Sequence, residues 1–280
     1  MLRAWGAVLL LLLSVQASAQ LRIASINMCA DELLLLLAPP EAIVSLSYLS
    51  QDPQYSRWVE AAKAYPLNYA GAEEILALQP DIVLAGQYSD PMVLRLLRQQ
   101  GMTVYQMTRP AKLSAMFDEA QHIGRLLGRE AQAEQLVMGW QQAIDRLTVK
   151  QQMGAMPSMA LIGPNGFTEG KGSLRDQMLQ LAGIVNLATA LGIEGNGELS
   201  LEQLVANSPD MIAIEDGTDN QHSLAQRLLN HPAIEKLAAT RVRLPANLWT
   251  CPGPSYVDAL ATLTKARNTW RQSQVAALEQ

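Results

Sequence analysis

Aromatic residues, basic charge and cysteine are all scarce in this sequence, and each shortage excludes a class of protein. The chain has 2 Phe, 5 Trp and 7 Tyr among 280 residues, too few for a surface that stacks nucleic-acid bases. Its 21 basic residues are outnumbered by 26 acidic ones, so no excess of cations can displace phosphate counterions. Two cysteines cannot build a disulfide scaffold, although they suffice for one bridge. We expect no nucleic-acid partner.

Motifs that carry catalysis are also absent. The sequence contains no G-x-S-x-G elbow, P-loop or H-E-x-x-H motif, and no G-x-G-x-x-G that follows a strand. The glycine-rich residues 192–197 are interpreted as a loop. The histidines, His122, His222 and His231, suggest no His–carboxylate–nucleophile set, and His231 before Pro232 is expected to cap or pack a helix start. These absences favour a binding protein over an enzyme.

The overall composition is that of a folded chain with more than one small core. Because 49% of its residues are hydrophobic and 17% are charged, the chain can bury enough surface to offset its ordering entropy. A length of 280 residues suits two packed domains or one large one.

The first nineteen residues have the pattern of a secretory signal peptide. Arg3 precedes an apolar stretch over residues 7–13, and Ala17-Ser18-Ala19 supplies the small-x-small cleavage site. The stretch is shorter than the roughly 20 residues that span a bilayer, and a buried N-terminal helix lacks a cap or a polar face. We expect cleavage after Ala19, which leaves 261 residues with a formal charge of −6. Because no cysteine stands at that point, we expect the protein not to be a lipoprotein, and we expect it free in the periplasm and not inserted in a membrane.

Short apolar segments alternate with helical ones along the rest of the chain. Strands are expected at residues 22–26, 43–46, 81–85, 102–107, 158–162, 210–214 and 241–244, a pattern typical of parallel sheets buried on both faces. Residues 113–150 are helical, with one break at Gly128, and residues 151–157 form a connector. We predict a signal peptide over 1–19, an N-terminal lobe over 20–128, a connecting helix and linker over 129–156, and a C-terminal lobe over 157–280.

Two segments repeat each other without a gap. Residues 73–83 (EEILALQPDIV) and 202–212 (EQLVANSPDMI) each start a short helix with Glu and pass through Pro-Asp into a buried strand. A helix connected to a strand through Pro-Asp is common, but the recurrence of this connection in both halves of the chain favours two lobes of similar topology. Glu73 and Glu202 are either two solvated first-turn residues or a pair of surface carboxylates that meet two arginines of a partner.

Ligands of two-lobed α/β proteins bind outside the carboxyl ends of the strands, where the lobes face each other. The candidates for this cleft are therefore the residues that follow strands. They are Asn27, Met28, Cys29, Tyr48, Gln87 and Tyr88 in the first half, and Asn165, Phe167, Glu169, Glu215, Asp216, Trp249 and Cys251 in the second. Their mixture of flat apolar surfaces and a few polar groups suits an organic ligand of some size.

Several segments together resemble one known family. They are residues 22–27 leading into Cys29-Ala30-Asp31-Glu32-Leu33, the strand end Ser45-Leu46-Ser47, the two repeats, His231-Pro232-Ala233 and Trp249-Thr250-Cys251-Pro252-Gly253-Pro254. Nearly all of the chain after residue 19 is similar to the ABC-transporter periplasmic substrate-binding proteins of the helical-backbone type. These proteins deliver vitamin B12, haem and ferric siderophores, and the paired E-x-x-x-A-x-x-P-D pattern is the most specific part of the likeness.

The resemblance implies an α/β fold of two Rossmann-like lobes with central parallel sheets. A single long helix, about residues 130–151, joins the lobes, and the ligand cleft lies between them. It also implies that Glu73 and Glu202 dock onto arginines of an ABC importer, whose permease and ATPase complex is the partner. We expect a monomer that is not an enzyme and has no resident cofactor.

The resemblance leaves the ligand open among metal chelates: cobalamin or another corrinoid, a ferric siderophore, or haem. Haem-binding members place a Tyr or His on the iron, a role that Tyr48 or Tyr88 could fill, and no other metal-binding residue is assigned. Siderophore binders often use arginines, and the strand-end loops here are poor in arginine, which favours a largely neutral chelate. The alternative function is an enzyme on the same fold, such as a metal-inserting chelatase, which needs a base and a His–carboxylate metal site.

The two cysteines allow three interpretations. Cys29 and Cys251 each follow a predicted strand, one in each lobe. In an oxidising compartment they are candidates for a disulfide across or beside the cleft, which requires Cα atoms within about 7 Å. They are otherwise two cleft thiols that contact a soft metal centre, or two unlinked buried cysteines.

Overall fold

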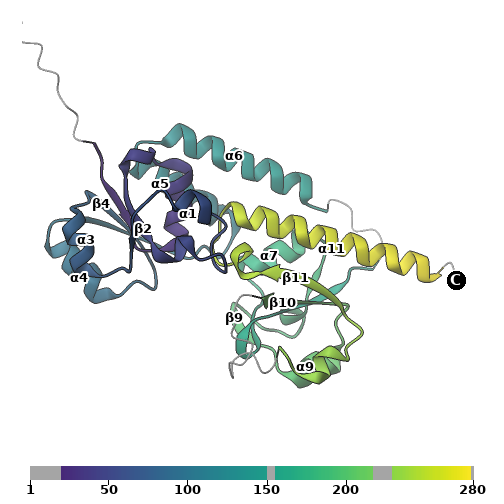
Figure 1. The fold of residues 1–280 in the computed structure, drawn as a ribbon. Helices are drawn as coiled ribbons and strands as arrows, with labels where there is room; N and C mark the ends of the chain where they lie inside the picture. Colours follow the sequence, from purple (N-terminus) through teal and green to yellow (C-terminus); the bar gives the residue numbers. More distant parts are fainter. Residues whose placement is uncertain (1–19, 150–154, 217–228, 279–280) are drawn as a thin grey trace, which may run out of the picture.

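A computed structural model describes residues 20–149, 155–216 and 229–278 of the chain as two α/β lobes (Figure 1). The expected signal peptide lies outside the described residues. The sequence also predicts a helix at residues 223–229, and most of this segment lies outside the described residues as well. The two-lobed α/β prediction is confirmed.

The first lobe is built on a five-stranded parallel sheet in the order β3-β2-β1-β4-β5. Its strands are β1 (Ile23–Ser25), β2 (Ile43–Ser47), β3 (Leu67–Asn68), β4 (Ile82–Gly86) and β5 (Thr103–Met107). The strand order reverses direction at β1, which makes the neighbouring β1 and β4 a topological switch point. The short β3 was not expected from the sequence.

The second lobe repeats this connectivity in a four-stranded parallel sheet in the order β11-β10-β6-β8. Its strands are β6 (Ser158–Ile162), β8 (Val185–Asn186), β10 (Met211–Asp216) and β11 (Thr240–Pro245). Thus β6, β8, β10 and β11 hold the places of β1, β2, β4 and β5. A further antiparallel pair joins β7 (Phe167–Glu169) to β9 (Asn196–Glu198), so the interpretation of residues 192–197 as a loop is wrong for its last two residues.

Helices cover both faces of each sheet. In the first lobe they are α1 (Met28–Leu37), α2 (Val59–Ala62), α3 (Ala72–Leu78), α4 (Pro91–Gln99) and α5 (Leu113–Leu126), followed by α6 (Glu130–Leu147). The second lobe has α7 (Leu174–Leu181), α8 (Leu187–Ala190), α9 (Leu201–Asn207), α10 (Pro232–Glu235) and α11 (Pro254–Leu278). The predicted break at Gly128 is present, because this residue has the positive φ of 64° that ends α5.

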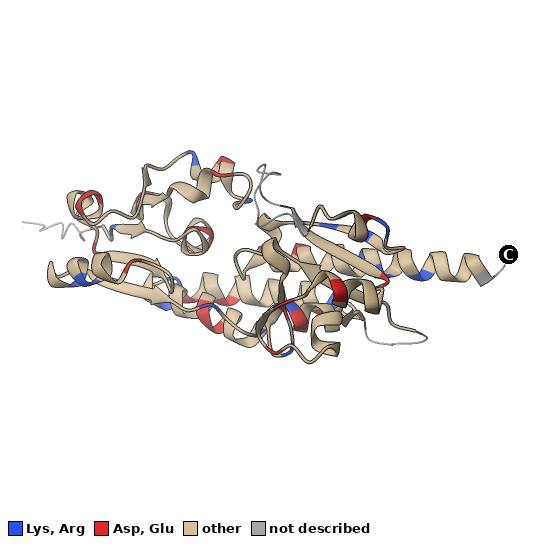
Figure 2. Ribbon diagram, turned by 90° about the horizontal axis from the view of Figure 1, so that it is seen from below, with Lys and Arg blue, Asp and Glu red and all other residues tan. Residues whose placement is uncertain are grey.

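Helix α6 connects the two sheets in sequence and spans about 27 Å at 1.5 Å per residue. It packs on both α5 and α11, and Figure 1 shows α6 and α11 along the same side of the molecule. Helix α11 extends beyond the second lobe, and charges of both signs are scattered over the two lobes (Figure 2).

The strands alternate between a core of their own lobe and a core that the lobes share. Ala24 and Val83 belong to a cluster confined to the first lobe, and Ile212 belongs to one confined to the second. Their strand neighbours Ile23 and Met211 belong to the largest cluster, which includes buried residues of both lobes. This is the period of two that a strand buried on both faces requires.

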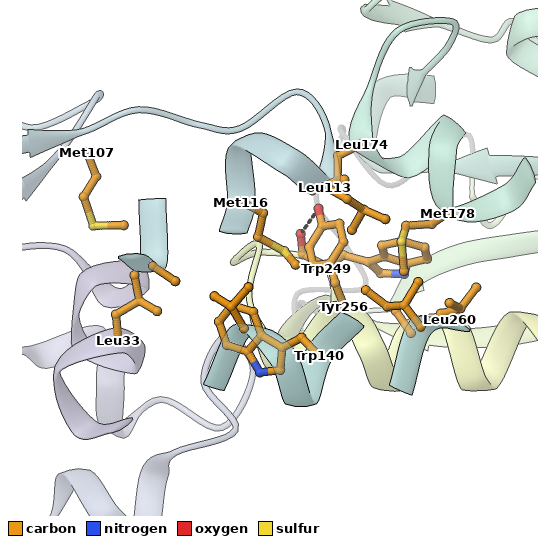
Figure 3. Close-up of a cluster of buried hydrophobic side chains, with 14 of the residues drawn as sticks. Leu33, Met107, Leu113, Met116, Trp140, Leu174, Met178, Trp249, Tyr256 and Leu260 are labelled. Atoms are coloured by element: carbon orange, nitrogen blue, oxygen red, sulfur yellow. Dashed lines mark hydrogen bonds between the residues drawn. The ribbon is translucent and has the colours of Figure 1, made fainter. Parts of the chain in front are cut away.

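The shared core includes Trp140 of α6 (Figure 3). Leu33 and Met116 belong to it from the first lobe, and Met178 and Leu260 from the second. Because one close-packed core includes both lobes, they cannot rotate far apart without opening voids.

The repeated segments have matching structures. In α3 the Glu74 Oε1 atom accepts from the Gly71 N–H at 2.7 Å, and in α9 the Gln203 Oε1 atom accepts from the Ser200 N–H at 2.9 Å. Both helices end at a residue with positive φ immediately before Pro-Asp, at 46° for Gln79 and 40° for Ser208.

The aspartate of each Pro-Asp pair fixes the first strand of its lobe. Asp81 Oδ2 accepts from the Arg22 N–H at 2.8 Å, and Asp210 Oδ2 accepts from the Ser158 N–H at 2.8 Å and from its hydroxyl at 2.8 Å. The internal repeat therefore encodes one helix–turn–strand connection that is used twice, linking β1 to β4 in the first lobe and β6 to β10 in the second.

We predict that Asp210→Ala lowers the free energy of unfolding by about 1.5–3 kcal/mol, the range for hydrogen bonds to charged groups. Asp81→Ala costs less, because Asp81 is exposed and makes one such bond to its strand. Urea unfolding measures both, with Asp210→Asn as the control that keeps an acceptor oxygen. Equal losses for Asp210→Ala and Asp210→Asn would contradict the assignment.

Candidate functional site

A cavity of about 410 Å³ lies between the lobes at the carboxyl ends of both sheets. This volume falls within the range of about 300–1,000 Å³ that is usual for small-molecule sites. Most of the wall is apolar, with polar groups at a few points. The lining residues are Ile26, Asn27, Met28, Cys29, Ser47, Leu49, Gly86, Gln87, Tyr88, Met107, Thr108, Arg109, Phe167, Arg175, Trp249 and Thr250.

The first-lobe wall is built on the switch point between β1 and β4. Asn27 follows β1 and caps α1, since its Oδ1 accepts from the Cys29 N–H at 3.0 Å and the Ala30 N–H at 3.2 Å. Gly86 ends β4 so close to Asn27 that a Cβ on Gly86 would lie 2.3 Å from the Asn27 amide nitrogen. A glycine is therefore required where the two chain segments meet at the cavity.

The second-lobe wall contains a rigid aromatic surface. Trp249 is buried, and the Tyr256 hydroxyl donates to its carbonyl oxygen at 3.0 Å (Figure 3). The guanidinium carbon of Arg175 lies 5.4 Å from the centre of a Trp249 ring, which is within cation–π range. Burial is the main cause that raises the pKa of Tyr256, so this residue stays a neutral hydroxyl at physiological pH.

A buried carboxylate connects two arginines of the wall. Glu169, at the end of β7, is 3% exposed and pairs with Arg109 of the first lobe and with Arg175 of α7 at 3.4 Å. A buried carboxylate needs such compensation, because an unpaired one would be costly to desolvate. Burial opposes the charge on Arg109, but the Glu169 carboxylate prevails and raises the pKa of Arg109. One anion and two cations thus leave this cluster one positive charge.

The two cysteines are joined to each other in the structure. Cys29 at the start of α1 and Cys251 after β11 form a disulfide with Cα atoms 5.1 Å apart. Of the three interpretations of the sequence, the structure has the one in which a bridge ties the lobes together. Cys29 is part of the cavity wall, so the bridge lies beside the cavity.

Other contacts between the lobes surround the disulfide. The Ser255 hydroxyl donates to Glu32 Oε1 at 3.1 Å, Arg57 pairs with Asp258, and the Asn247 side chain donates to the Pro53 carbonyl at 3.1 Å. Burial raises the pKa of Glu32. Around the disulfide, the two lobes are therefore linked by several side-chain contacts in addition to the covalent bond.

Asp31, beside Glu32 on α1, is also buried. Its Oδ1 accepts from the Ser47 N–H at 3.2 Å, and burial raises the pKa of its carboxyl well above the usual range. The contact holds the end of β2, where Ser47 lines the cavity.

The structure brings most of the residues expected in the cleft to the cavity between the lobes. Seven line the cavity: Asn27, Met28, Cys29, Gln87, Tyr88, Phe167 and Trp249. Cys251 does not line the cavity itself but is bonded to Cys29, which does. Glu169 does not line it either, but it pairs with the lining residues Arg109 and Arg175.

Tyr48 and Asn165 are not among the lining residues. Tyr48 starts a 3-10 turn (Tyr48–Gln51) and stacks on Tyr69 with ring centres 4.9 Å apart, and Asn165 is exposed in a turn. Glu215 and Asp216 end β10, but their side chains lie outside the described part of the chain.

The expectation that the cleft is poor in arginine is wrong. Arg109 and Arg175 both line the cavity, although neither directly follows a strand. Arg109 is the second residue after β5, and Arg175 is in the first turn of α7. A search extended by two residues beyond each strand finds Arg109, whereas no local signal in the sequence finds Arg175.

Glu73 and Glu202 are exposed on α3 and α9, on separate lobes (Figure 1). Hydrogen bonds from its own backbone N–H and from Ser200 lower the pKa of Glu202, which keeps this residue anionic. His231 caps α10 as predicted, since its Nδ1 accepts from the Ala233 N–H at 3.1 Å.

Within the described residues, no three His, Cys, Asp or Glu side chains lie close enough to hold a metal ion. In the same residues we find no helix with the length and apolarity needed to cross a membrane.

Comparison with known proteins gives concordant results. The sequence pattern of the family described as periplasmic binding protein matches residues 23–243. A cobalamin-binding protein of Halobacterium salinarum is 22% identical over 254 residues, which cover 88% of this chain and 69% of that protein.

Solved structures have the same fold. A periplasmic heme binding protein from Pseudomonas aeruginosa is 27% identical with a TM-score of 0.72, over 88% of this chain and 92% of that one. A periplasmic vitamin B12 binding protein of Vibrio cholerae is 19% identical with a TM-score of 0.65, over 89% of this chain and 97% of that one.

Removal of the disulfide should lower the free energy of unfolding by about 2–5 kcal/mol, because the bridge closes a long loop of the unfolded chain. Urea unfolding of the oxidised protein and of Cys29→Ser with Cys251→Ser measures the loss. A mass of the unreduced protein without the two-hydrogen deficit, or equal stability of both forms, would contradict the bridge.

Proposed function

This chain belongs to the periplasmic binding proteins, and from that premise we propose that it captures a metal chelate between its lobes and delivers it to an ABC importer. The observation that carries the proposal is the cavity, which places flat apolar side chains and two arginines at the carboxyl ends of both sheets. Such a wall suits an organic ligand with a large apolar face and a few polar or charged groups.

The relatives narrow the class of ligand. A cobalamin-binding protein and a heme binding protein are both similar to this chain over most of its length. Cobalamin, haem and ferric siderophores share a metal held by an organic chelator, so the proposal covers all three. Because Arg109 and Arg175 line the cavity and arginine binds carboxylates well, the proposed ligands include anionic chelates as well as largely neutral ones.

We propose a binding role without catalysis and without a resident cofactor, the metal being part of the cargo. The matching family is one of binding proteins, and a metal-inserting chelatase remains the alternative, which turnover of a porphyrin or corrin with free metal would establish. The proposal includes export to the periplasm with cleavage after Ala19, and a monomeric protein.

Tyr88 allows a direct test of the cavity. This side chain lines the cavity yet is 81% exposed, so a ligand seated there would cover it. We predict that haemin, cyanocobalamin or a member of a ferric siderophore panel quenches tryptophan fluorescence, and that Tyr88→Ala weakens this binding about tenfold through lost aromatic contact.

Tyr69→Ala is the matched control, because Tyr69 is 73% exposed and does not line the cavity. Its affinity should equal that of the unaltered protein. Failure of every chelate to bind, or equal losses in the two variants, would contradict the proposal.

For delivery, we propose that Glu73 and Glu202 contact basic residues of the permease. Each glutamate is exposed at the start of a repeated helix, so the pair presents one carboxylate on each lobe. Carboxylates pair well with arginine, which binds them in a bidentate geometry. The repeated helix–turn–strand connection that holds α3 and α9 would keep the two carboxylates at a fixed separation.

Glu73→Ala combined with Glu202→Ala should lower chelate uptake by cells about tenfold or more, the equivalent of about 1.4 kcal/mol of docking free energy. Ligand affinity of the purified protein should not change. The control is Glu60→Ala with Glu194→Ala, which removes one exposed glutamate of each lobe from local pairs with Lys63 and Lys171. Normal uptake by the first double variant would refute the docking role.

A further inference from the structure

The interface between the lobes has two ends that occupy equivalent places in the duplicated fold. Cys29 follows β1 and bonds to Cys251 after β11. Arg109 follows β5 and pairs with Glu169, which follows β6 by way of β7. Because β6 holds the place of β1 and β11 that of β5, the disulfide and the ion pair correspond to each other.

Equivalent helices beside the two ends are also linked by hydrogen bonds between the lobes. At the cysteine end, Glu32 of α1 accepts from Ser255 at the start of α11. At the charged end, Gln177 of α7 accepts from the Leu113 N–H at the start of α5, at 2.9 Å. Equivalent positions therefore carry a disulfide at one end and the ion pair of Arg109 with Glu169 at the other, and an ion pair, unlike a disulfide, can exchange its partner for a ligand.

The charged end places two guanidinium groups in the cavity wall and one carboxylate between them. Arg109 and Arg175 both line the cavity, and each guanidinium carries five N–H donors. Glu169 engages Nη2 of Arg109 and lies 3.4 Å from Nε of Arg175, both through its Oε1. The carboxylate is 3% exposed, so solvent screens its charge little.

We propose that Glu169 sets the charge preference of the cavity, leaving one positive charge that a single anionic group of the ligand neutralises. The favoured cargo is then a chelate with one carboxylate directed at Arg109 and Arg175. This inference rests on the proposed function and makes Glu169 a positioning residue that determines specificity through the two arginines.

A series of probes on one macrocycle tests the inference: haemin with two free carboxylates, its monomethyl ester with one, and its dimethyl ester with none. For the unaltered protein, the first carboxylate should tighten binding about tenfold or more, the gain for hydrogen bonds to a charged group. The second carboxylate should change the affinity less than about threefold, because the cluster is already neutralised. Cyanocobalamin and one of its monocarboxylates provide the same comparison on a corrin.

Two variants separate the role of Glu169 from simple attraction. Glu169→Gln keeps the shape of the side chain and removes the negative charge that compensates the two arginines, so the second carboxylate should also tighten binding about tenfold. Arg109→Gln leaves a neutral cluster, so all three haemin probes should bind within about threefold of each other. Arg95→Gln, an exposed arginine of α4 away from the cavity, is the control and should behave as the unaltered protein.

Arg109 is partly exposed, so its variant remains informative if Glu169→Gln does not fold, as circular dichroism and thermal unfolding would show. Equal binding of acid and ester forms by the unaltered protein overturns the inference and leaves the proposed function standing. So does an Arg109→Gln variant that keeps the preference, or a Glu169→Gln variant that gains nothing from the second carboxylate. Failure of both the haemin and the cobalamin probes, with no siderophore bound, overturns the proposed function itself.

Discussion

The packing of both sheets against one hydrophobic core is the constraint on which the rest of this structure depends. Residues of both lobes form a single buried cluster that includes Trp140 of α6. The carboxyl ends of the two sheets are therefore held facing each other at a distance that the core determines. The cavity is largely preformed, and a ligand need not supply the free energy of a large domain closure.

Duplication explains much of the remaining architecture. Each lobe uses the same Pro-Asp turn, in which Asp81 accepts from Arg22 beside β1 and Asp210 accepts from Ser158 of β6. The copies have diverged where they meet the cavity, because one end of the interface has a disulfide and the other has the cluster around Glu169. The disulfide holds the two lobes together beside the cavity, and the charged cluster places two arginine side chains in the cavity wall.

The sequence predicts the elements that local patterns determine. The strand at Ser158–Ile162 has the predicted bounds, because Pro157 and Gly163 flank it. The short helix expected to start at Glu202 is present as Leu201–Asn207, where Ser200 caps it. The β7–β9 pair escapes prediction, since the Asn-Gly-Glu of β9 has no apolar residue and becomes a strand only through its partner. The predicted lobe boundaries at residues 128 and 156 stay predictions.

The site is predictable where residues follow strands and not where packing redirects them. Trp249 and Phe167 line the cavity as expected, whereas the turn after β2 directs Tyr48 onto Tyr69. The link between Arg109 and Glu169 joins residues 60 positions apart, and only the tertiary fold brings them together.

The central claim is that one metal chelate occupies the cavity between the lobes. Native mass spectrometry of the unreduced protein, isolated from its own cells and then saturated with each chelate in turn, tests this claim most directly. We predict a complex of one protein and one chelate that survives desalting. A protein that stays at its unliganded mass with haemin, cobalamin and every ferric siderophore offered would contradict the account.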